Sequence, residues 1–468
     1  MEKGVAASKD EVYELLETEK TEFGKPISTR FIIPEEYLWK NVTNRAIGLG
    51  EKITEAMRAI AKENPELGGV IDVVDFNETT GGERILSDDV LYKVALILNR
   101  TRLGIKDVEP DILGRAYEYM IRKFSKDSGQ SAGEFYTPYE VGWLMVGLLD
   151  PEPGDEVYDP ACGSGGLLIK SQLYVREKGG KEPLQLFGQE KIPFTYAIAR
   201  MNVIIHSMEA DIQRGDTFAN PKFVEDGRVK KFKKVIANPP WNQDIPVEIF
   251  ERDVYNRFSF EIPPGNTADW GWIQHMYASL KDDGKLVVII DTNAVSRGSG
   301  SQGRDREKEI RKKFVEKDLI EAVILTPENL FYNTTAAGLI LVINNNKPED
   351  RKGKILLINA SKEFVKGTPK NIISKDSIDK ITRVYENFEE AEMFSRIITV
   401  EEARKNDYNL STSRYVSVFE EENHRNVDEI LEDLRVLSRE EKEIDAELNE
   451  ILVKLGFEGF LNSRVENP

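Results

Sequence analysis

The sequence of 468 residues contains a single cysteine and three histidines, and this scarcity limits its chemistry. One cysteine cannot build a disulfide framework or a cysteine-rich zinc site, and such usage is typical of a reducing cytosol. No apolar run approaches the ~20 residues that cross a bilayer, and the opening Met1–Gly4 lacks the apolar core of a signal peptide. These absences predict a soluble, cytoplasmic protein with no membrane partner and no metal site.

A net basic charge is also missing. The chain has 64 lysine and arginine residues against 82 aspartate and glutamate residues, which gives a formal net charge of -18. A protein that holds DNA by itself usually has a basic balance, so contact with nucleic acid would need local basic patches or a partner. The length predicts about three domains, or one large domain with extensions.

Residues 1–125 have mostly helical patterns and no motif that carries chemistry. Apolar residues recur at helical spacing from Ala46 to Ala61, and Gly68-Gly69 closes this element. Further helices are expected over 88–98 and 112–124, with a turn cluster at 77–82. The segment predicts a helical interaction domain.

A flexible stretch, Gly129–Gly133, then introduces a loop and a helix over Val141–Leu149. Adjacent aromatic residues in such a loop are usually core plugs, but their position just before the next motif favours contact with a ligand. The candidate ligand-binding residues of this loop are Glu134, Phe135, Tyr136, Thr137, Pro138 and Tyr139.

The next motif, Val157–Gly166, is a strand that ends in an acid, followed by a glycine-rich turn and an apolar helix. Glycines let the backbone approach a ligand at the helix start, where unpaired N–H groups attract negative groups. A dinucleotide site would need a third glycine or alanine at position 168, where this chain has leucine. A carboxylate at the strand end suits a ligand with a cationic amine, which a methionine moiety offers. The candidate residues are Asp159, Gly163, Ser164, Gly165 and Gly166.

Two further acids follow strands. Glu190 comes after the strand predicted at Leu184–Gly188, and Asp216 comes after a helix over Pro193–His206 and a short strand. An acid at the end of the second strand is where α/β nucleotide sites hold ribose hydroxyls. Together with Asp159, these acids predict one ligand site at the carboxyl edge of a parallel sheet.

The tetrapeptide Asn238-Pro239-Pro240-Trp241 ends the buried run Val235–Ala237. Two consecutive prolines forbid helix and sheet pairing, so the chain must leave the sheet in a stiff, extended turn. The turn presents a carboxamide, free carbonyls and a flat indole. These suit a planar amine, because the acceptors bind its N–H groups and the ring stacks on its face. A proline-rich turn with a packed tryptophan is the alternative that the motif alone leaves open.

Later strands are expected over Lys285–Asp291, Leu319–Leu325 and Gly338–Asn344, with an edge strand over Lys354–Asn359 and none after about Ser374. Strands that alternate with helices predict an α/β domain with a mostly parallel sheet over residues 126–375.

Two basic stretches are expected beside the carboxyl edge. Arg228–Lys234 has five cations in seven residues, and it fits a solvated face as well as it fits a phosphate contact. Arg297–Lys313 is a Gly/Ser loop with seven cations and three acids that leads into a helix. Its flexibility near the predicted site favours phosphate contact.

The C-terminal segment, residues 376–468, ends in a long predicted helix, Val427–Leu455. Between Glu420 and Glu450 there are 13 acidic and 4 basic residues, so this helix is not expected to lie on DNA. Its apolar residues lie three and four apart, broken only at Glu441, which is typical of a coiled-coil seam. They are Val427, Ile430, Leu434, Leu437, Ile444, Leu448, Ile451 and Leu455. The seam could pack on a partner or fold back on its own domain.

In this order and spacing, the motifs resemble those of the modification (methyltransferase) subunit of type I restriction–modification systems. The resemblance extends from about Phe31 through the C-terminal helix, and the segment before Phe31 is shorter than the usual opening helices of that family. It rests on Gly133–Pro138, Asp159–Gly166, Gly188–Glu190, Asn238–Trp241 and Tyr408–Leu410. The implied fold is a Rossmann-like methyltransferase domain between an N-terminal helical domain and a C-terminal coiled-coil-like helix.

The resemblance implies methylation of the exocyclic amine of adenine in DNA by S-adenosylmethionine. Asp159, the glycine turn and Glu190 are expected to hold the methyl donor, with Asp216 near its adenine and the loop that contains Thr137 over its methionine end. Asn238 and the Pro239 carbonyl would accept hydrogen bonds from an adenine flipped out of double-stranded DNA, and Trp241 would stack on it. The implied partners are a sequence-specificity subunit, a second copy of the methyltransferase subunit and a restriction (translocase/nuclease) subunit.

Two alternatives remain at this stage: a methyltransferase for a glutamine amide of a protein, and a catalytically silent assembly subunit. The partner helix and the extent of the resemblance argue against the first, and the filled chemical positions argue against the second. The mechanism needs neither histidine nor a thiol. His206, His275 and His424 are therefore predicted to be structural, and Cys162 is predicted to be a small packing residue.

Overall fold

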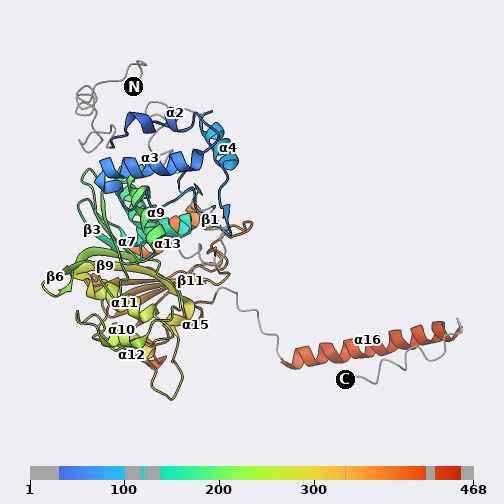
Figure 1. Cartoon of the computed structure of the whole chain (residues 1–468). Helices are drawn as coiled ribbons and strands as arrows, with labels where there is room; N and C mark the ends of the chain where they lie inside the picture. Colours follow the sequence, from blue (N-terminus) through green and yellow to red (C-terminus); the bar gives the residue numbers. More distant parts are fainter. Residues whose placement is uncertain are drawn as a thin grey trace. The chain divides into compact units, whose positions relative to one another are not determined.

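The computed structural model describes residues 31–100, 116–117, 119–120, 123, 137–332, 334–417 and 427–454. Most of the helix predicted over 112–124 and the loop residues Glu134, Phe135 and Tyr136 lie outside this part of the chain. The chain divides into two compact units, Met1–Val418 and Phe419–Pro468 (Figure 1).

The described N-terminal region of the first unit is helical, as predicted. The helices are η1 (Glu35–Tyr37), α2 (Trp39–Val42), α3 (Leu49–Glu63), η2 (Pro65–Leu67) and α4 (Asp88–Leu98). Leu49 and Ala56 of α3 pack against Leu91 and Ala95 of α4 in a small apolar cluster. The turn predicted at 77–82 is the tip of a short hairpin, β1 (Thr79–Thr80) and β2 (Glu83–Arg84).

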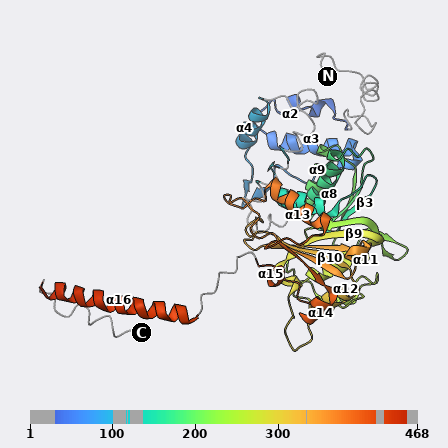
Figure 2. The same ribbon diagram turned by 180° about the vertical axis from the view of Figure 1, so that it is seen from behind.

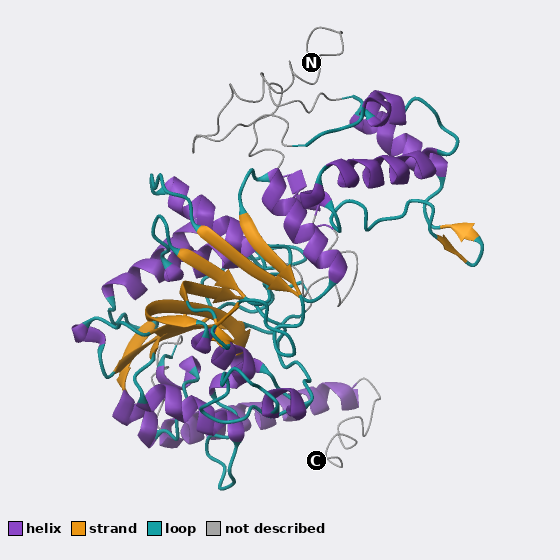
Figure 3. Ribbon diagram, turned by 60° about the vertical axis from the view of Figure 1, so that its left-hand side comes forward, coloured by secondary structure: helices purple, strands orange, loops and turns teal. Residues whose placement is uncertain are grey.

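A sheet forms the centre of the first unit (Figure 3). It has nine strands in the order β13-β12-β10-β11-β9-β8-β3-β4-β5. Its strands are β3 (Glu156–Asp159), β4 (Gln185–Glu190), β5 (Ala210–Arg214), β8 (Phe232–Ala237), β9 (Leu280–Asp291), β10 (Ile320–Leu325), β11 (Gly338–Asn344), β12 (Lys354–Asn359) and β13 (Ser395–Thr399). Neighbouring strands from β5 to β9 pair in parallel, whereas β11 and β13 run antiparallel to their neighbours. The predicted α/β fold with a mostly parallel sheet is therefore confirmed.

The order of the strands reverses at β3: β4 and β5 continue on one side of it, and β8 begins the other side. This strand pairs with β4, the next strand of the sheet along the chain, on one side and with β8 on the other. In an open α/β sheet, ligands bind beyond the carboxyl ends of the strands at such a switch point. Asp159 ends β3 and Asn238 directly follows β8, so the switch point brings two predicted site residues together.

Helices cover both faces of the sheet (Figures 1 and 2). The helices of the first unit after the N-terminal region are α7 (Tyr139–Leu149), α8 (Gly166–Glu177), α9 (Pro193–Ile205), α10 (Val247–Glu251), α11 (Asp269–Ala278), η3 (Thr292–Val295), α12 (Arg306–Glu316), η4 (Glu349–Arg351), α13 (Lys375–Asn387), α14 (Val400–Lys405) and α15 (Thr412–Tyr415). A short hairpin, β6 (Val224–Glu225) and β7 (Arg228–Val229), precedes β8.

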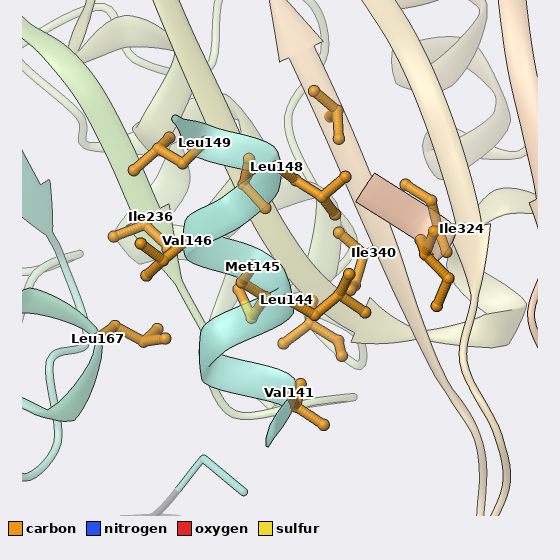
Figure 4. Close-up of a cluster of buried hydrophobic side chains, with 14 of the residues drawn as sticks. Val141, Leu144, Met145, Val146, Leu148, Leu149, Leu167, Ile236, Ile324 and Ile340 are labelled. Carbon is orange, nitrogen blue, oxygen red and sulfur yellow. The ribbon is translucent and has the colours of Figure 1, made fainter. Parts of the chain in front are cut away.

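The almost wholly apolar helix α7 lies at the centre of one layer. Its side chains Leu144, Met145 and Leu148 are fully buried, and the cluster around them includes Ile236 of β8 and Ile340 of β11 (Figure 4). A second cluster on the other face combines residues of α11 and α12 with the same strands. Because α7 begins directly after Thr137 and Pro138, its burial fixes the end of the predicted ligand loop against the sheet.

The C-terminal boundary of the sheet differs from the prediction. The expectation that strands stop near Ser374 is wrong, because Ser395–Thr399 forms β13 and pairs with β12. As a consequence, β12 is an interior strand and not the predicted edge. Residues 375–387 form α13, which supplies Ile381 and Val384 to the same core as α7.

The second unit contains helix α16 (Val427–Lys454), close to the predicted span. Four residues of the predicted seam have described side chains, Leu434, Leu437, Ile444 and Leu448, and all four are exposed. The helix is confirmed, whereas its pairing in a coiled coil stays a prediction. Over the residues that the structure describes, no helix is long and apolar enough to cross a membrane.

Candidate functional site

A pocket lies at the switch point of the sheet. It is lined by Thr137, Gly142, Asp159, Ala161, Cys162, Gly163, Ser164, Gly166, Leu167, Lys170 and Asn238. These residues come from the end of the predicted ligand loop, the glycine turn, helices α7 and α8, and the tetrapeptide after β8. Segments that the sequence identified separately therefore share one cavity. The other predicted site residues in the described part lie outside its lining: Pro138, Tyr139, Gly165, Glu190, Asp216, Pro239, Pro240 and Trp241.

The glycine turn has a backbone that only glycine adopts easily. Gly163 and Gly165 have φ angles of +53° and +77°, in the left-handed region. The turn is held by hydrogen bonds from Cys162 N to Gln189 O at 3.0 Å and from Asn202 Nδ2 to Ser164 O at 2.9 Å. Helix α8 begins at Gly166, so its first N–H groups point toward the pocket end of the turn.

Asp159 is buried, with 1% of its surface exposed. Its Oδ1 accepts a hydrogen bond from Ala161 N at 3.0 Å, and in the described part of the chain no donor reaches Oδ2. Burial raises the pKa of Asp159 to about 8, and the nearby Glu190 carboxylate acts in the same direction. A buried acid of this kind gains most from a cationic ligand, because a positive charge compensates for the lost hydration.

Glu190 connects the second strand end to the glycine turn. Its Oε2 accepts from Gly163 N at 3.1 Å, and its Oε1 accepts from Ile192 N at 2.7 Å. Burial raises the pKa of Glu190, although these backbone N–H groups oppose the shift. Each oxygen keeps a further lone pair, so the carboxylate can accept hydroxyl hydrogen bonds while it also shapes the turn.

Asp216 follows β5 and caps the loop that comes after it. Its Oδ1 accepts from Phe218 N at 2.9 Å and Ala219 N at 3.0 Å, and its Oδ2 pairs with Lys191 at 2.8 Å. Burial acts to raise its pKa, but the Lys191 ammonium and the two N–H groups hold the pKa of Asp216 below its ordinary value. This acid is therefore ionised and already partnered.

Asn238 is half-buried at the mouth of the pocket, and its amide is oriented. Its Nδ2 donates to Thr137 Oγ1 at 3.2 Å, so Oδ1 is the remaining side-chain acceptor. The indole of Trp241 donates to Ile289 O at 3.2 Å and meets the ring of Phe331 edge-to-face at 4.7 Å. Trp241 is thus partly packed, as expected for a simple proline-rich turn, and partly exposed beside Asn238.

Lys170 is the charged pocket residue that the sequence did not reveal, and Gly142 and Leu167 were also not predicted. It stands one turn into α8, is 2% exposed, and its ammonium lies 4.8 Å from the centroid of the Tyr139 ring. Tyr139 itself is 41% exposed and does not line the pocket. The only signal was a lysine within the otherwise apolar start of α8, where a long side chain usually reaches solvent.

The first basic stretch lies away from this site, which corrects its predicted position. Residues 228–234 lead into β8 and therefore lie at the amino end of that strand. Lys231 and Lys233 form ion pairs with Asp282 and Asp283, at 2.8 and 2.6 Å. Lys234 is buried and donates to Leu149 O and Asp150 O at the carboxyl end of α7. These partners favour the solvated face over a phosphate contact for Lys231 and Lys233, and Lys234 belongs to the interior.

The second basic stretch follows β9 and does lie beside the tetrapeptide. Several of its cations serve the fold: Arg311 donates to Tyr408 O at 2.7 Å, and Lys308 pairs with Asp407 at 3.2 Å. Exposed Arg304 pairs with Glu261 at 2.5 Å, and Arg306 is exposed at the start of α12. The phosphate contact stays a prediction, and Arg304 and Arg306 are the exposed cations of this stretch that are placed for it.

The described histidines and the cysteine have structural surroundings. His275 is buried between Tyr158 Oη and Arg257 NH1, each at 3.2 Å, and burial together with Arg257 lowers its pKa. His206 bonds to Asn202 O at 2.9 Å. Burial raises the pKa of the Cys162 thiol, which disfavours a nucleophilic thiolate. His424 lies outside the described residues.

Two protein-family models match this chain. A model described as N-6 DNA Methylase matches residues 108–424, and one described as HsdM N-terminal domain matches residues 2–96. The chain belongs to the N-6 DNA methylase family. The N-terminal match begins before Phe31, where the resemblance was expected to start.

Named relatives agree with this assignment. The type I restriction enzyme MjaVII methylase subunit of Methanocaldococcus jannaschii is 40% identical over 425 residues, which cover 87% of this chain and 70% of the relative. The HindI methylase subunit of Haemophilus influenzae is 30% identical over 433 residues, which cover 88% of this chain and 94% of the relative. The crystal structure of a type I restriction-modification system methyltransferase subunit from Streptococcus thermophilus aligns with a TM-score of 0.71 and 27% identity, covering 83% of this chain and 82% of that one.

This N-6 DNA methylase is an adenine-specific DNA methyltransferase, and the predicted enzyme class is confirmed. The predicted resemblance to type I methyltransferase subunits is confirmed as well. The family match favours DNA over a protein glutamine as the substrate.

Proposed function

We propose that this chain transfers the methyl group of S-adenosylmethionine to the N6 amine of an adenine flipped out of double-stranded DNA, as the methyltransferase subunit of a cytoplasmic type I restriction–modification complex. The observation that carries the proposal is the shared pocket of Asp159, the glycine turn, Thr137 and Asn238 at the switch point of the sheet. The residues predicted to bind the methyl donor and those predicted to bind the target base therefore line one cavity.

The residues present fit the methyl donor. Asp159 has a buried carboxylate whose Oδ2 lacks a donor in the described part of the chain, which suits the cationic amine of the methionine moiety. Glu190 has lone pairs free for ribose hydroxyls, and the loop capped by Asp216 is available to the adenine ring. Lys170 lines the same pocket with a positive charge, which suits the donor's carboxylate.

The donor's sulfonium supplies the leaving group when it is bound, so the protein chiefly orients the attacking amine. An aromatic amine is a poor nucleophile because its lone pair is delocalised into the ring. Asn238 Oδ1 accepts one N–H of this amine and the Pro239 carbonyl accepts the other, which favours a pyramidal nitrogen and stabilises the positive charge that develops on it. Thr137 fixes which end of the Asn238 amide faces the base.

Trp241 holds the flipped base by stacking. Its indole N–H is fixed on Ile289 O, so the ring plane is set before the base arrives. A preset aromatic surface lowers the ordering penalty of base capture, and base–aromatic stacking is worth about 1–3 kcal/mol. Pro240 keeps the turn between Asn238 and Trp241 stiff.

The acidic helix α16 supports a division of labour with partners. Its exposed aliphatic residues Leu434, Leu437, Ile444 and Leu448 suit a helical partner, whereas its acids oppose contact with phosphates. We propose that α16 binds the sequence-specificity subunit. We expect a second methyltransferase copy and a restriction subunit in the full complex. Deletion from Val427 onward should abolish co-purification with the specificity subunit while donor binding persists.

Isotope-labelled methyl transfer tests the proposal. The chain, purified with the specificity subunit, is incubated with labelled S-adenosylmethionine and duplex DNA that contains the target site. Label should appear as N6-methyladenine in DNA and should disappear in the Asn238→Ala variant. Label in protein glutamine, or DNA labelling that survives Asn238→Ala, would overturn it.

A further inference from the structure

Arg297 lies at the carboxyl edge of the sheet, in the loop after η3, next to the turn that carries Asn238 and Trp241. It is the first residue of the second basic stretch, for which the sequence favoured a phosphate contact. The guanidinium is instead directed inward, and 21% of its side chain is exposed. It does not line the donor pocket.

The guanidinium of Arg297 contacts three carboxylates from three different elements. NH1 lies 2.9 Å from Asp269 Oδ2 at the start of α11 and 3.0 Å from both carboxylate oxygens of Glu307 in the first turn of α12. NH2 lies 3.2 Å from Asp291 Oδ1 at the end of β9. All three acids are buried, with 0%, 2% and 7% of their surface exposed for Asp269, Glu307 and Asp291. One side chain therefore ties together the elements that surround the tetrapeptide.

The same guanidinium contacts the chain directly after the tetrapeptide. Arg297 NH2 donates to Asn242 Oδ1, and Asn242 N donates to Asp269 Oδ1 at 3.4 Å. Asn242 has a φ angle of +50°, a left-handed conformation that asparagine tolerates better than most residues. Both its backbone and its side chain are thus held by the Arg297 cluster.

The electrostatics of the cluster require a cation at this position. Burial raises the pKa of Glu307 to about 6 and raises that of Asp269, while Arg297 opposes both shifts. The three acids therefore repel one another and lack hydration, and the single guanidinium compensates for both effects. Its planar fork also reaches several acceptors at once, which a lysine ammonium cannot do with the same geometry.

The tetrapeptide is consequently fixed at both ends. Asn238 is bonded to Thr137 at the entrance, Trp241 is bonded to Ile289 O, and Asn242 is bonded to Arg297 at the exit. Because two prolines make the segment stiff, a shift at Asn242 is transmitted to the indole and the amide. We propose that Arg297 is a positioning residue for the target base, acting through Asn242 on Trp241 and Asn238 and leaving donor binding unaffected. This inference rests on the proposed function.

The test uses the Arg297→Lys variant of the full chain in complex with the specificity subunit. Lysine keeps the positive charge among the three acids and removes the bond to Asn242, so the fold should persist. The single-turnover rate at saturating donor should fall about 10-fold or more, because small misplacements of reacting groups have large effects on rate. The dissociation constant of S-adenosylmethionine should change less than about 2-fold.

A double variant separates positioning from a merely structural role. Asn242→Gly removes the acceptor of Arg297 and tolerates the left-handed backbone. If Arg297 acts through Asn242, the double variant should be no slower than Arg297→Lys alone. Multiplicative losses in the double variant, an unchanged rate in Arg297→Lys, or a parallel loss of donor affinity would each overturn the inference.

Arg351→Lys provides a matched control. Arg351 pairs at 3.1 Å with the buried Glu321, near the amino end of β10, on the side of the sheet opposite the site. Loss of this fork should lower the melting temperature without a change in the methylation rate below it. A wild-type complex that does not methylate adenine would refute the proposed function, whereas an active wild type with a normal Arg297→Lys rate would refute only this inference.

Discussion

Because the carboxyl group of Asp159 is buried, we expect both the stability of the fold and the affinity for the methyl donor to depend on pH. Burial raises its pKa from 3.8 to about 8, so it holds a proton at neutral pH before the donor binds. A folded-state pKa above the unfolded value means that the folded chain binds more protons between these two pH values. Its contribution to stability is therefore lost as pH rises from 3.8 toward about 8.

Donor binding should reverse this protonation. A cationic amine beside Asp159 favours the ionised carboxylate, so binding should release the proton. With a pKa of about 8, a carboxyl releases ~0.9 proton at pH 7, and affinity should rise by up to ~10-fold per pH unit below the pKa. Above about pH 8 this dependence should disappear, because the carboxylate is then already ionised.

Calorimetry with S-adenosylhomocysteine, the unreactive product, measures both quantities. Heats recorded at one pH in buffers of different ionisation enthalpy give the number of protons released. The ligand's own amine titrates in a similar range, at a pKa of ~8 for an α-amino group, so Asp159→Asn serves as the reference. Wild type should release nearly one proton more than this variant at pH 7. Equal proton release in the two proteins would refute the placement of the amine beside Asp159.

Three further variants probe the site. Asn238→Ala should lower the single-turnover rate ~100-fold or more with donor affinity nearly unchanged, because the Asn238 acceptor acts in the transition state. Transfer of the labelled methyl group in quenched reactions measures this rate. Glu190→Gln should weaken donor binding ~10-fold in calorimetry, because the amide loses one acceptor toward the ribose. The new amide nitrogen must face either Gly163 N or Ile192 N, so this variant also loses one of the two turn contacts, whereas Glu190→Ala would lose both. Lys170→Met should weaken the donor but not its decarboxylated analogue, and equal losses for both would exclude a contact with the carboxylate.

The local patterns predicted the strands that build the site. β3, β4 and β8 are short buried runs bounded by glycine, proline or acids, as expected for parallel strands covered on both faces. The predicted bounds of β3 and β4 lie within two residues of the observed ones, whereas β8 begins at Phe232, three residues before the predicted run Val235–Ala237. The βα rhythm predicts that these strands run in parallel, so Asp159 and Asn238 were expected at one edge, whereas the order β8-β3-β4 was not predicted. β13 was missed because it is a five-residue edge strand with a mixed burial pattern, which carries little periodic signal.

Long-range partnerships could not be predicted. Nothing in the sequence around Lys234 indicates that its ammonium caps α7, whose last residues lie 84 and 85 positions earlier in the chain. The charge run 228–234 is local, whereas the bonds that use its charges depend on how the sheet brings distant segments together. The same holds for Arg297, whose three carboxylates follow no shared spacing.

The cations of the two basic stretches, 228–234 and 297–313, face either solvent or the interior according to the partners near them. Each stretch has a buried or half-buried cation that binds groups at the end of a helix: Lys234 binds carbonyls at the end of α7, and Arg297 binds Asp269 at the start of α11. Buried polar groups must find partners, so a cation beside an element end is drawn inward. Exposed Arg304 and Arg306 are the members of the second stretch still placed for phosphate contact. We therefore expect the electrostatic attraction of DNA to come from cations near the tetrapeptide and from the proposed partner, and this division makes a net charge of -18 compatible with DNA as the substrate.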